Sequence, residues 1–356
     1  MTLRRAVGAV AVCLLLSTAC GGGPDRPSVL TDLADEVVIP AYEKFQADSG
    51  ALDAAASRLC SGPSDGALSD ARAALAETRR SWSYLESMWV GPVMDRRSWA
   101  VVRWPVAVDE IEDLISDPSI ELDRDRLTNR IGADQRGLGA VEYVLYESGD
   151  PSTSDVLGAL GDPRRCAYLT GVAETIASEA SVVADGWTSS WDGGEPYRGQ
   201  FAAADGEGLD SVVNDVLFLL ESVTDLELGA ALGAMGSAPR PEAIDEGPAG
   251  AGVEDLVHRL DGARAVLIGG RSRPGSGLAP LLGEDLPGRL SDQFTAALAA
   301  AQALEPPLRA AAVDSPAAVA AARDAIKAIQ IMVATEVVGR LGVTIGFSDA
   351  DGDSSG

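Results

Sequence analysis

Apolar residues recur at the spacing of an α-helix through nearly every ordered segment of this chain, and this pattern restricts the fold more than any other feature. In the first half, the segments with this spacing are 29–59, 68–89, 106–115, 124–146 and 164–187. Strand-like alternation bounded by turn residues is scarce. The sequence therefore predicts an all-α first half, with Pro40 as a kink in its first helix.

A Gly- and Asp-rich segment, residues 191–208, separates these helices from a second helical series. The members of that series are 209–233, 253–268, 286–304 and 317–341. Four long helices in each half predict an all-α protein of two helical-bundle domains, joined by long loops rich in Pro and Gly. We place the N-terminal bundle at 29–190, the C-terminal bundle at 209–347 and an acidic tail at 348–356.

The first nineteen residues have Arg4 and Arg5 ahead of an apolar run and end in small residues, which is typical of an export signal. The Ser-Thr-Ala-Cys junction at Cys20 resembles the lipobox of bacterial lipoproteins, although Ser17 stands where leucine is usual. The sequence thus predicts a protein held at the cell membrane by a lipid on Cys20, facing outside the cytoplasm, with residues 20–28 as a flexible tether. The alternative is a secreted protein cut near Ala19.

Charge narrows the classes of partner. Loss of Arg4 and Arg5 with the signal leaves 26 basic against 54 acidic side chains, so the mature chain has a net charge of −28. Such a chain is a poor ligand for nucleic acid. The predicted partners are the membrane, through the lipid anchor, and an envelope transport partner; cationic ligands also fit this charge.

Two cysteines remain after Cys13 leaves with the signal and Cys20 takes a lipid. Cys60 and Cys166 form an even pair in an oxidising compartment, where disulfides persist. We predict one disulfide between them, and two free buried thiols are the alternative.

The stretch RGLGAVEYVLYESG, residues 136–149, sets a carboxylate into an apolar helix. At 100° per residue from Leu138, the side chains of Val141, Leu145 and Tyr146 fall on one side, and Glu142 lies inside their arc. Glu142 should therefore face the core or a cavity. A structural Glu142 would be satisfied by Arg136, a tyrosine or backbone N–H groups.

Four blocks carry a resemblance to a known family. RGLGAVEYVLYESG resembles the Gly-x-His-x-x-Glu signature of the imelysin family, and RWPVAVDEIEDLI, with Trp104, resembles the family's Trp-Pro segment. VEDLVHRLDGARAVLIGG and LGVTIGFSDADGD resemble its second-domain helix and its C-terminal ending. The resemblance implies an exported protein of two helical bundles with the motif near the cleft between them, and relatives linked to iron acquisition, alginate binding or a peptidase name.

The motif carries over with one departure. Gly137 matches its first glycine and Glu142 its glutamate, while Gly139 occupies the histidine position and supplies no ligand. Because residues 139 and 142 are neighbours on a helix, a histidine there would share a cation with Glu142. Trp104, Arg136, Gly137 and Gly139 are thus expected to support the motif and its cleft.

Without a histidine in the motif, a metal site in this chain would have to be built from oxygen ligands. Glu142, with Asp109 and Glu112 after the Trp-Pro pair, would suit a hard cation such as Ca²⁺, Mg²⁺ or ferric iron. The alternative for Asp109 and Glu112 is a solvated helix face. The single histidine, His258, falls on a predicted helix of the other domain and reads better as a surface or core residue than as a ligand. The acidic DADGD ending lacks the spacing of a calcium loop.

Three functions follow from these residues. The first is a non-catalytic binding protein of the imelysin type, serving iron or other cation uptake at the envelope or presenting a cleft to another ligand. The second is a scaffold or interaction protein with a degenerate site. The third, a metallopeptidase, would need a metal that activates water, and the one imidazole of the family motif is absent.

The lipid anchor is directly testable. Replacing Cys20 by Ala removes the thiol that is predicted to carry the lipid. The protein should therefore move from the membrane fraction to the soluble exported fraction. Fractionation followed by mass analysis of the mature N-terminus checks this. An unmodified N-terminus cut near Ala19 in the parent protein would refute lipidation.

Overall fold

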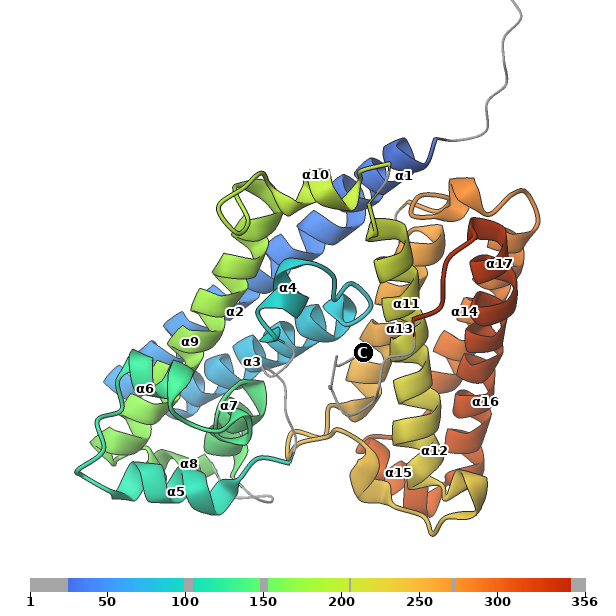
Figure 1. Ribbon diagram of the computed structural model, residues 1–356. Helices are drawn as coiled ribbons and strands as arrows, with labels where there is room; N and C mark the ends of the chain where they lie inside the picture. Colours follow the sequence, from blue (N-terminus) through green and yellow to red (C-terminus); the bar gives the residue numbers. More distant parts are fainter. Residues whose placement is uncertain (1–24, 99–104, 148–152, 205, 271–272, 347–356) are drawn as a thin grey trace, which may run out of the picture.

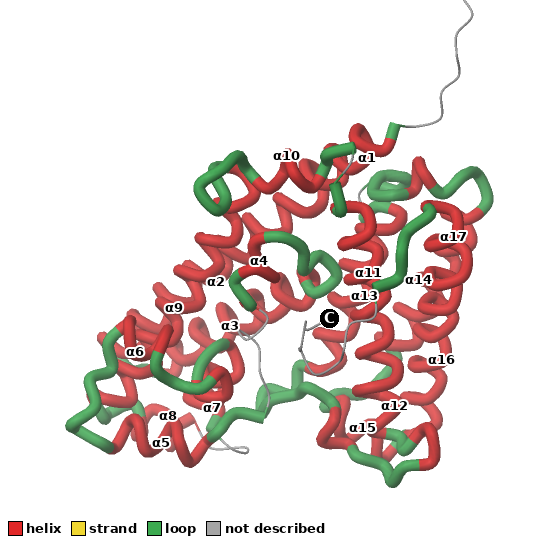
Figure 2. The backbone as a smooth tube through the Cα atoms, viewed as in Figure 1, coloured by secondary structure: helices red, strands yellow, loops and turns green. Residues whose placement is uncertain are grey.

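Helices dominate the chain. The computed structural model describes residues 25–98, 105–147, 153–204, 206–270 and 273–346, and no strand occurs among them. Figure 2 shows helices joined by loops throughout. The all-α prediction is therefore confirmed. The signal, Cys20, Trp104 and the tail 348–356 lie outside the described residues.

The first group of helices fills the blue-to-green part of Figure 1. Its long members are α2 (Ile39–Ser61), α3 (Asp65–Leu85) and α9 (Pro163–Thr188). Around them lie α1 (Arg26–Leu33), α4 (Pro92–Asp95), α5 (Val108–Ser116), α6 (Arg124–Asn129), α7 (Leu138–Tyr146), α8 (Thr153–Ala159) and α10 (Tyr197–Phe201). Side-chain caps fix two of the long helices: Ser64 accepts a hydrogen bond from the N–H of Ala67 (3.2 Å) and Asp162 from that of Arg164 (2.8 Å).

The second group occupies the yellow-to-red part of Figure 1. Its members are α11 (Gly208–Glu221), α12 (Leu228–Ala231), α13 (Gly252–Ile268), α14 (Leu286–Gln302), α15 (Leu308–Asp314), α16 (Pro316–Met332) and α17 (Val338–Leu341). α14 packs on both α13 and α16. The domain limits given above stay predictions.

Several expected helices are interrupted. The segment expected as one helix from Arg124 to Tyr146 is broken into α6, a 3₁₀ turn at Ala133–Gln135 and α7. Gly132 and Gly137 flank the turn, and Gly137 has φ of +85°, a value that side chains disfavour. Short π-helical stretches also occur, at Ala34–Val38, Ser222–Glu227 and Val333–Val337. The first ends at Val38, two residues before Pro40, whose missing N–H cannot continue an α-helical ladder.

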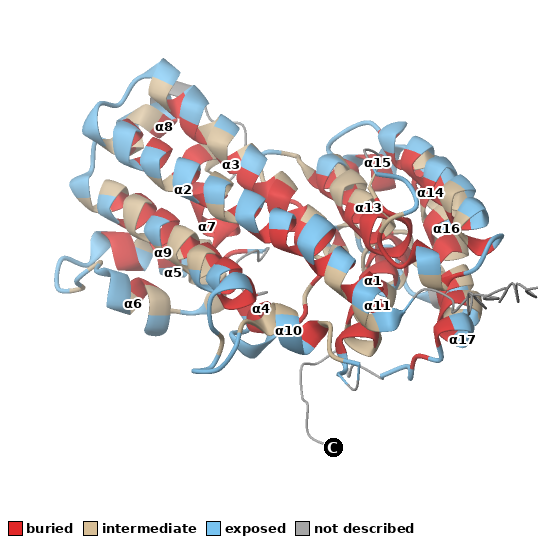
Figure 3. Cartoon of the chain, turned by 90° about the horizontal axis from the view of Figure 1, so that it is seen from above, coloured by how far each residue is buried: buried red, intermediate tan, exposed pale blue. Residues whose placement is uncertain are grey.

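The two groups meet along α3 and α13. Figure 3 shows buried residues on the facing sides of these helices. Gly262 on α13 allows the close approach, since a Cβ there would overlap the backbone carbonyl of Tyr84 and the Oγ of Ser87. The junction is therefore tightly packed. Among the described helices, none combines the length and the hydropathy that a membrane span requires.

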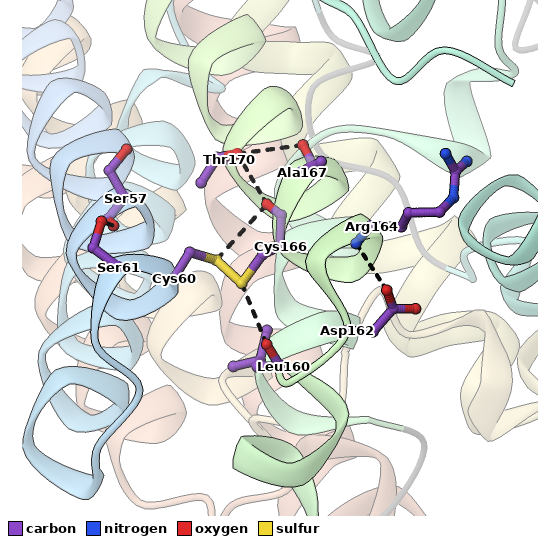
Figure 4. Close-up of a disulfide and its surroundings, with 9 residues drawn as sticks. All are labelled: Ser57, Cys60, Ser61, Leu160, Asp162, Arg164, Cys166, Ala167 and Thr170. Atoms are coloured by element: carbon purple, nitrogen blue, oxygen red, sulfur yellow. Dashed lines mark hydrogen bonds between the residues drawn. A yellow bond between two sulfur atoms is a disulfide. The ribbon is translucent and has the colours of Figure 1, made fainter. Parts of the chain in front are cut away.

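The predicted disulfide is present and lies within the first group. Cys60, near the end of α2, is bonded to Cys166 in the first turn of α9, with a Cα–Cα distance of 5.5 Å. Figure 4 shows the bond, with the Oγ1 of Thr170 donating to the carbonyl of Cys166 at 2.9 Å. The bond ties the two long helices together and encloses the motif helix α7 in its loop.

We expect the Cys60→Ser/Cys166→Ser variant to lose roughly 2 to 5 kcal/mol of unfolding free energy, because the bond closes a loop of 106 positions in the unfolded chain. Urea titration followed by circular dichroism measures the loss. Ser61→Ala, which changes an exposed neighbour on the same helix turn, is the control and should stay near the parent value. A loss no larger than that of Ser61→Ala would contradict the prediction.

Candidate functional site

The motif glutamate is buried at the junction of the two helix groups. Glu142 lies on α7, whose residues from Leu138 to Leu145 are all buried, and its side chain is 0% exposed. The expectation that it faces the core is confirmed. A carboxylate in such a place must be paired or hydrogen-bonded.

An arginine of α3 provides the charge partner. The Nη1 of Arg79 lies 2.5 Å from the Oε2 of Glu142, and the Arg79 side chain is only 4% exposed. The guanidinium therefore stands beside the motif carboxylate, where a bound cation would otherwise balance its charge. Arg136, one of the three kinds of partner expected from the sequence, instead donates from Nη1 to the carbonyl of Thr128.

A loop of the second group covers Glu142 from the other side. The N–H of Ala249 donates to Oε1 of Glu142 at 2.8 Å. Gly247 makes this possible, since a Cβ at that position would overlap the Glu142 carboxylate. One of the alternatives raised by the sequence, a backbone N–H as the structural partner, is thus present.

Arg79 also reaches across to α13. Its Nη2 is ion-paired with Oδ2 of Asp255, whose other oxygen accepts from the Oγ of Ser83 at 3.1 Å. Burial disfavours the charged guanidinium, but Asp255 and Glu142 outweigh this effect and raise the pKa of Arg79. Arg79 is therefore a permanent cation between one carboxylate from each helix group.

A second buried arginine lies close by. Arg259 on α13 pairs with Glu86 at the end of α3 (2.8 Å) and with Glu227 in the π-helical stretch before α12 (2.9 Å). Burial first, and then the neighbouring carboxylates Glu227, Asp255 and Asp245, raise the pKa of Glu86 to about 7, against the pull of Arg259. Two arginines thus organise the acids of the junction.

Glu112 belongs to a separate cluster. Its Oε1 accepts from the Tyr143 hydroxyl and from Nη1 of Arg165, both at 2.7 Å. Burial, followed by the hydrogen bond to Glu112, raises the pKa of Tyr143 to about 12. Asp109 is exposed in the first turn of α5. The structure therefore does not bring the oxygens of Asp109 and Glu112 to Glu142.

The other described residues singled out from the sequence do not add ligands to Glu142. Gly137 caps the start of α7, and Gly139 is buried within that helix. His258 is half-buried on α13. Trp104 lies outside the described residues. Across the described segments, no group of three or more His, Cys, Asp or Glu side chains has the geometry to hold a metal ion.

Sequence reasoning missed Arg79 and Asp255. One signal for Arg79 was available: with Leu75 and Trp82 it forms an i, i+4, i+7 row, so it stands on the apolar stripe of its helix. A guanidinium on a buried stripe needs an acid, and Glu142 was a buried acid in need of a cation. Nothing in the local pattern joins two residues 63 positions apart.

These features define a class: an all-helical protein of two packed helix groups, with a motif glutamate held in a buried ion pair at their junction. The chain belongs to the imelysin family, whose sequence profile matches residues 38–335. None of the curated proteins compared with the chain matches it significantly.

Two solved structures have the same fold. An imelysin-like protein from Psychrobacter arcticum superposes with a TM-score of 0.72 at 19% identity, covering 90% of this chain and 97% of the other. A protein from Parabacteroides distasonis, described as an iron-regulated protein A precursor, superposes with the same TM-score at 18% identity and the same coverage. At these identities the likeness shows the fold alone.

Removing either partner of the buried pair should destabilise the protein. Glu142→Gln leaves Arg79 with one carboxylate, and we expect a loss of roughly 1 to 3 kcal/mol in unfolding free energy. Arg79→Met strands two carboxylates, so its loss should be larger, on the order of 3 to 5 kcal/mol. Urea titration measures both.

Glu254→Gln is the matched control, because Glu254 pairs with Arg80 at 3.1 Å on the exposed rim of the same junction. An exposed pair contributes about 0 to 1 kcal/mol. Equal effects of Glu142→Gln and Glu254→Gln would show that the buried pair does not stabilise the fold.

Proposed function

We propose that this protein is a non-catalytic binding protein of the imelysin type, exported and held at the cell membrane by a lipid on Cys20. The observation that carries the proposal is the ion pair of Arg79 with Glu142. It commits the motif carboxylate to the junction of the two helix groups, so the residue that would bind or activate a metal-bound water serves the structure instead.

Hydrolysis fits these residues poorly. A metallopeptidase needs several ordered ligands around a metal that activates water. Gly139 supplies no imidazole. The guanidinium of Arg79 lies against Glu142, the glutamate that would share a metal with a histidine at position 139. A metal cation bound at Glu142 would be repelled at short range by the positive charge of Arg79.

Cation or iron uptake is the second candidate role. It is favoured by the net charge of −28 and by the likeness to a protein described as an iron-regulated precursor. In that role the cation would be bound by acidic groups outside the motif. The hard cations considered for Glu142, namely Ca²⁺, Mg²⁺ and ferric iron, remain the ligands to test, together with an envelope transport partner.

Metal analysis separates these roles from a motif-centred site. Protein purified without chelator should carry no metal that Glu142→Gln removes, and calorimetry with Zn²⁺ should detect no site in Gly139→His, because Arg79 still holds Glu142. Asp109→Asn, on the exposed face of α5, is the control for general loss of acidic charge. Stoichiometric metal lost only in Glu142→Gln would overturn the proposal in favour of a motif metal site.

A further inference from the structure

The junction between the helix groups is built largely from ionisable groups. Five buried or half-buried polar contacts cross it: Arg79 with Asp255, Ser83 with Asp255, Glu86 with Arg259, the Trp89 N–H with Asp215 (2.7 Å), and the Ala249 N–H with Glu142. Each joins the part of the chain before residue 202 to the part after residue 207. The charge state of these groups therefore bears on whether the two groups stay together.

Acids outnumber bases at this junction. Among the described residues, six carboxyl groups gather here: five interact with the guanidinium groups of Arg79 and Arg259, and the sixth, Asp215, interacts with Glu86. The six are Glu86, Glu142, Asp215, Glu227, Asp245 and Asp255. If all six were ionised, this region would carry an excess of negative charge away from water, which is costly.

Two of these acids have weak support for their charged form. Asp215, on α11, accepts a single N–H from Trp89, and the Oδ1 of Asp245 is buried without a hydrogen-bond partner in the described structure. Neither forms an ion pair within 4 Å with a described residue, in contrast to Glu142, Asp255 and Glu227. A proton is the simplest group that would neutralise them.

The environment of these acids acts in the same direction. Burial, reinforced by neighbouring carboxylates, raises the pKa of Asp245 to about 6 and that of Glu86 to about 7. Burial also raises the pKa of Asp215 well above its usual range, and the charge of Glu86 adds to this. Glu86 and Asp245 both face Asp255 and Arg259 on α13 and Glu227 before α12, and they face each other. Asp245 also faces Arg79 on α3, and Asp215 faces Glu86 and Tyr42 on α2.

We propose that the junction of the two helix groups is a proton-operated joint, which Glu86, Asp215 and Asp245 hold closed when protonated and loosen when ionised. Arg79 neutralises Glu142 and Asp255, and Arg259 neutralises Glu227, so these pairs are the fixed part of the joint. Glu86 lies 2.8 Å from the Nε of Arg259, but that buried Nε makes no hydrogen bond in the described structure, so the charged form of Glu86 is weakly held. Loosening lets water reach the carboxylates, so the charged forms favour the open arrangement.

The direction of the effect follows from proton linkage. Exposed carboxyls titrate near pH 4, so between about pH 4 and 7 the closed form binds more protons than the open form. Closure is therefore strongest at the acid end of this window and weakens as the pH rises. For Glu86 alone, raising the pH from 5 to 8 should increase the opening equilibrium by roughly tenfold to a hundredfold.

Thiol labelling measures the opening directly. Ser83→Cys places a thiol in the junction at a position that is 3% exposed, and the native Cys60 and Cys166 are bonded to each other. In the mature chain with Cys20→Ser, the labelling rate of Cys at 83 by a maleimide is measured from pH 5 to 8. Each rate is divided by the rate of the same thiol in denatured protein at that pH. The corrected rate should rise at least tenfold.

A second buried thiol separates joint opening from unfolding. Ser49→Cys, at a fully buried position of α2 inside the first group, should show no such rise. Glu86→Gln and Asp215→Asn, which imitate the protonated acids, should each reduce the pH dependence at position 83, whereas Glu254→Gln on the exposed rim should leave it unchanged. Circular dichroism of each variant confirms that it is folded.

Three results would overturn the proposal. They are a corrected rate at position 83 that does not change with pH, an equal rise at position 49, and a pH dependence that survives in both Glu86→Gln and Asp215→Asn. Should Glu86→Gln or Asp215→Asn fail to fold, the pH series of the Ser83→Cys and Ser49→Cys proteins without those changes decides the matter alone.

Discussion

The junction of the two helix groups depends on the two ion pairs that the guanidinium of Arg79 forms. The guanidinium joins the motif glutamate of α7 to Asp255 of α13, and its own helix, α3, packs against both partners. A buried cation between two carboxylates does not by itself make a fold more stable than apolar packing would, but removing one member leaves charges that cannot reach water. The pairing therefore specifies how the two helix groups meet, while the apolar core supplies most of the favourable free energy.

The same pairing changes the meaning of the family motif in this chain. With a histidine at position 139, the motif would present two ligands on neighbouring turns of a helix. Here Gly139 removes one of them and Arg79 takes the other as an ion-pair partner. The two departures agree with each other, since a site without its imidazole has less use for an open carboxylate. This agreement supports the non-catalytic role proposed above.

Much of the fold could be predicted from the sequence because helical periodicity is a local signal. The long helices and the buried position of Glu142 were predictable from this periodicity. The disulfide of Cys60 with Cys166 was predictable from the two cysteines that remain in an exported chain. The break between α6 and α7 was not, because apolar spacing continues through it while Gly137 adopts a positive φ. The partner of Glu142 was not predictable either, since Arg79 and Arg136 are equally plausible charges until the helices are placed in space.

The two ion pairs of Arg79 become possible at different times as the chain emerges. Arg79 and Glu142 are 63 positions apart and belong to the first helix group, whereas Asp255 lies 176 positions after Arg79. During vectorial synthesis or translocation, the first pair is able to form well before Asp255 exists outside the exit channel, because domains fold as their residues emerge. A half-finished chain then presents Arg79 with one free edge of its guanidinium. In that order of events, the free edge would be ready to pair with Asp255 when α13 emerges, and the N-terminal group would already be in place when the C-terminal group packs on it.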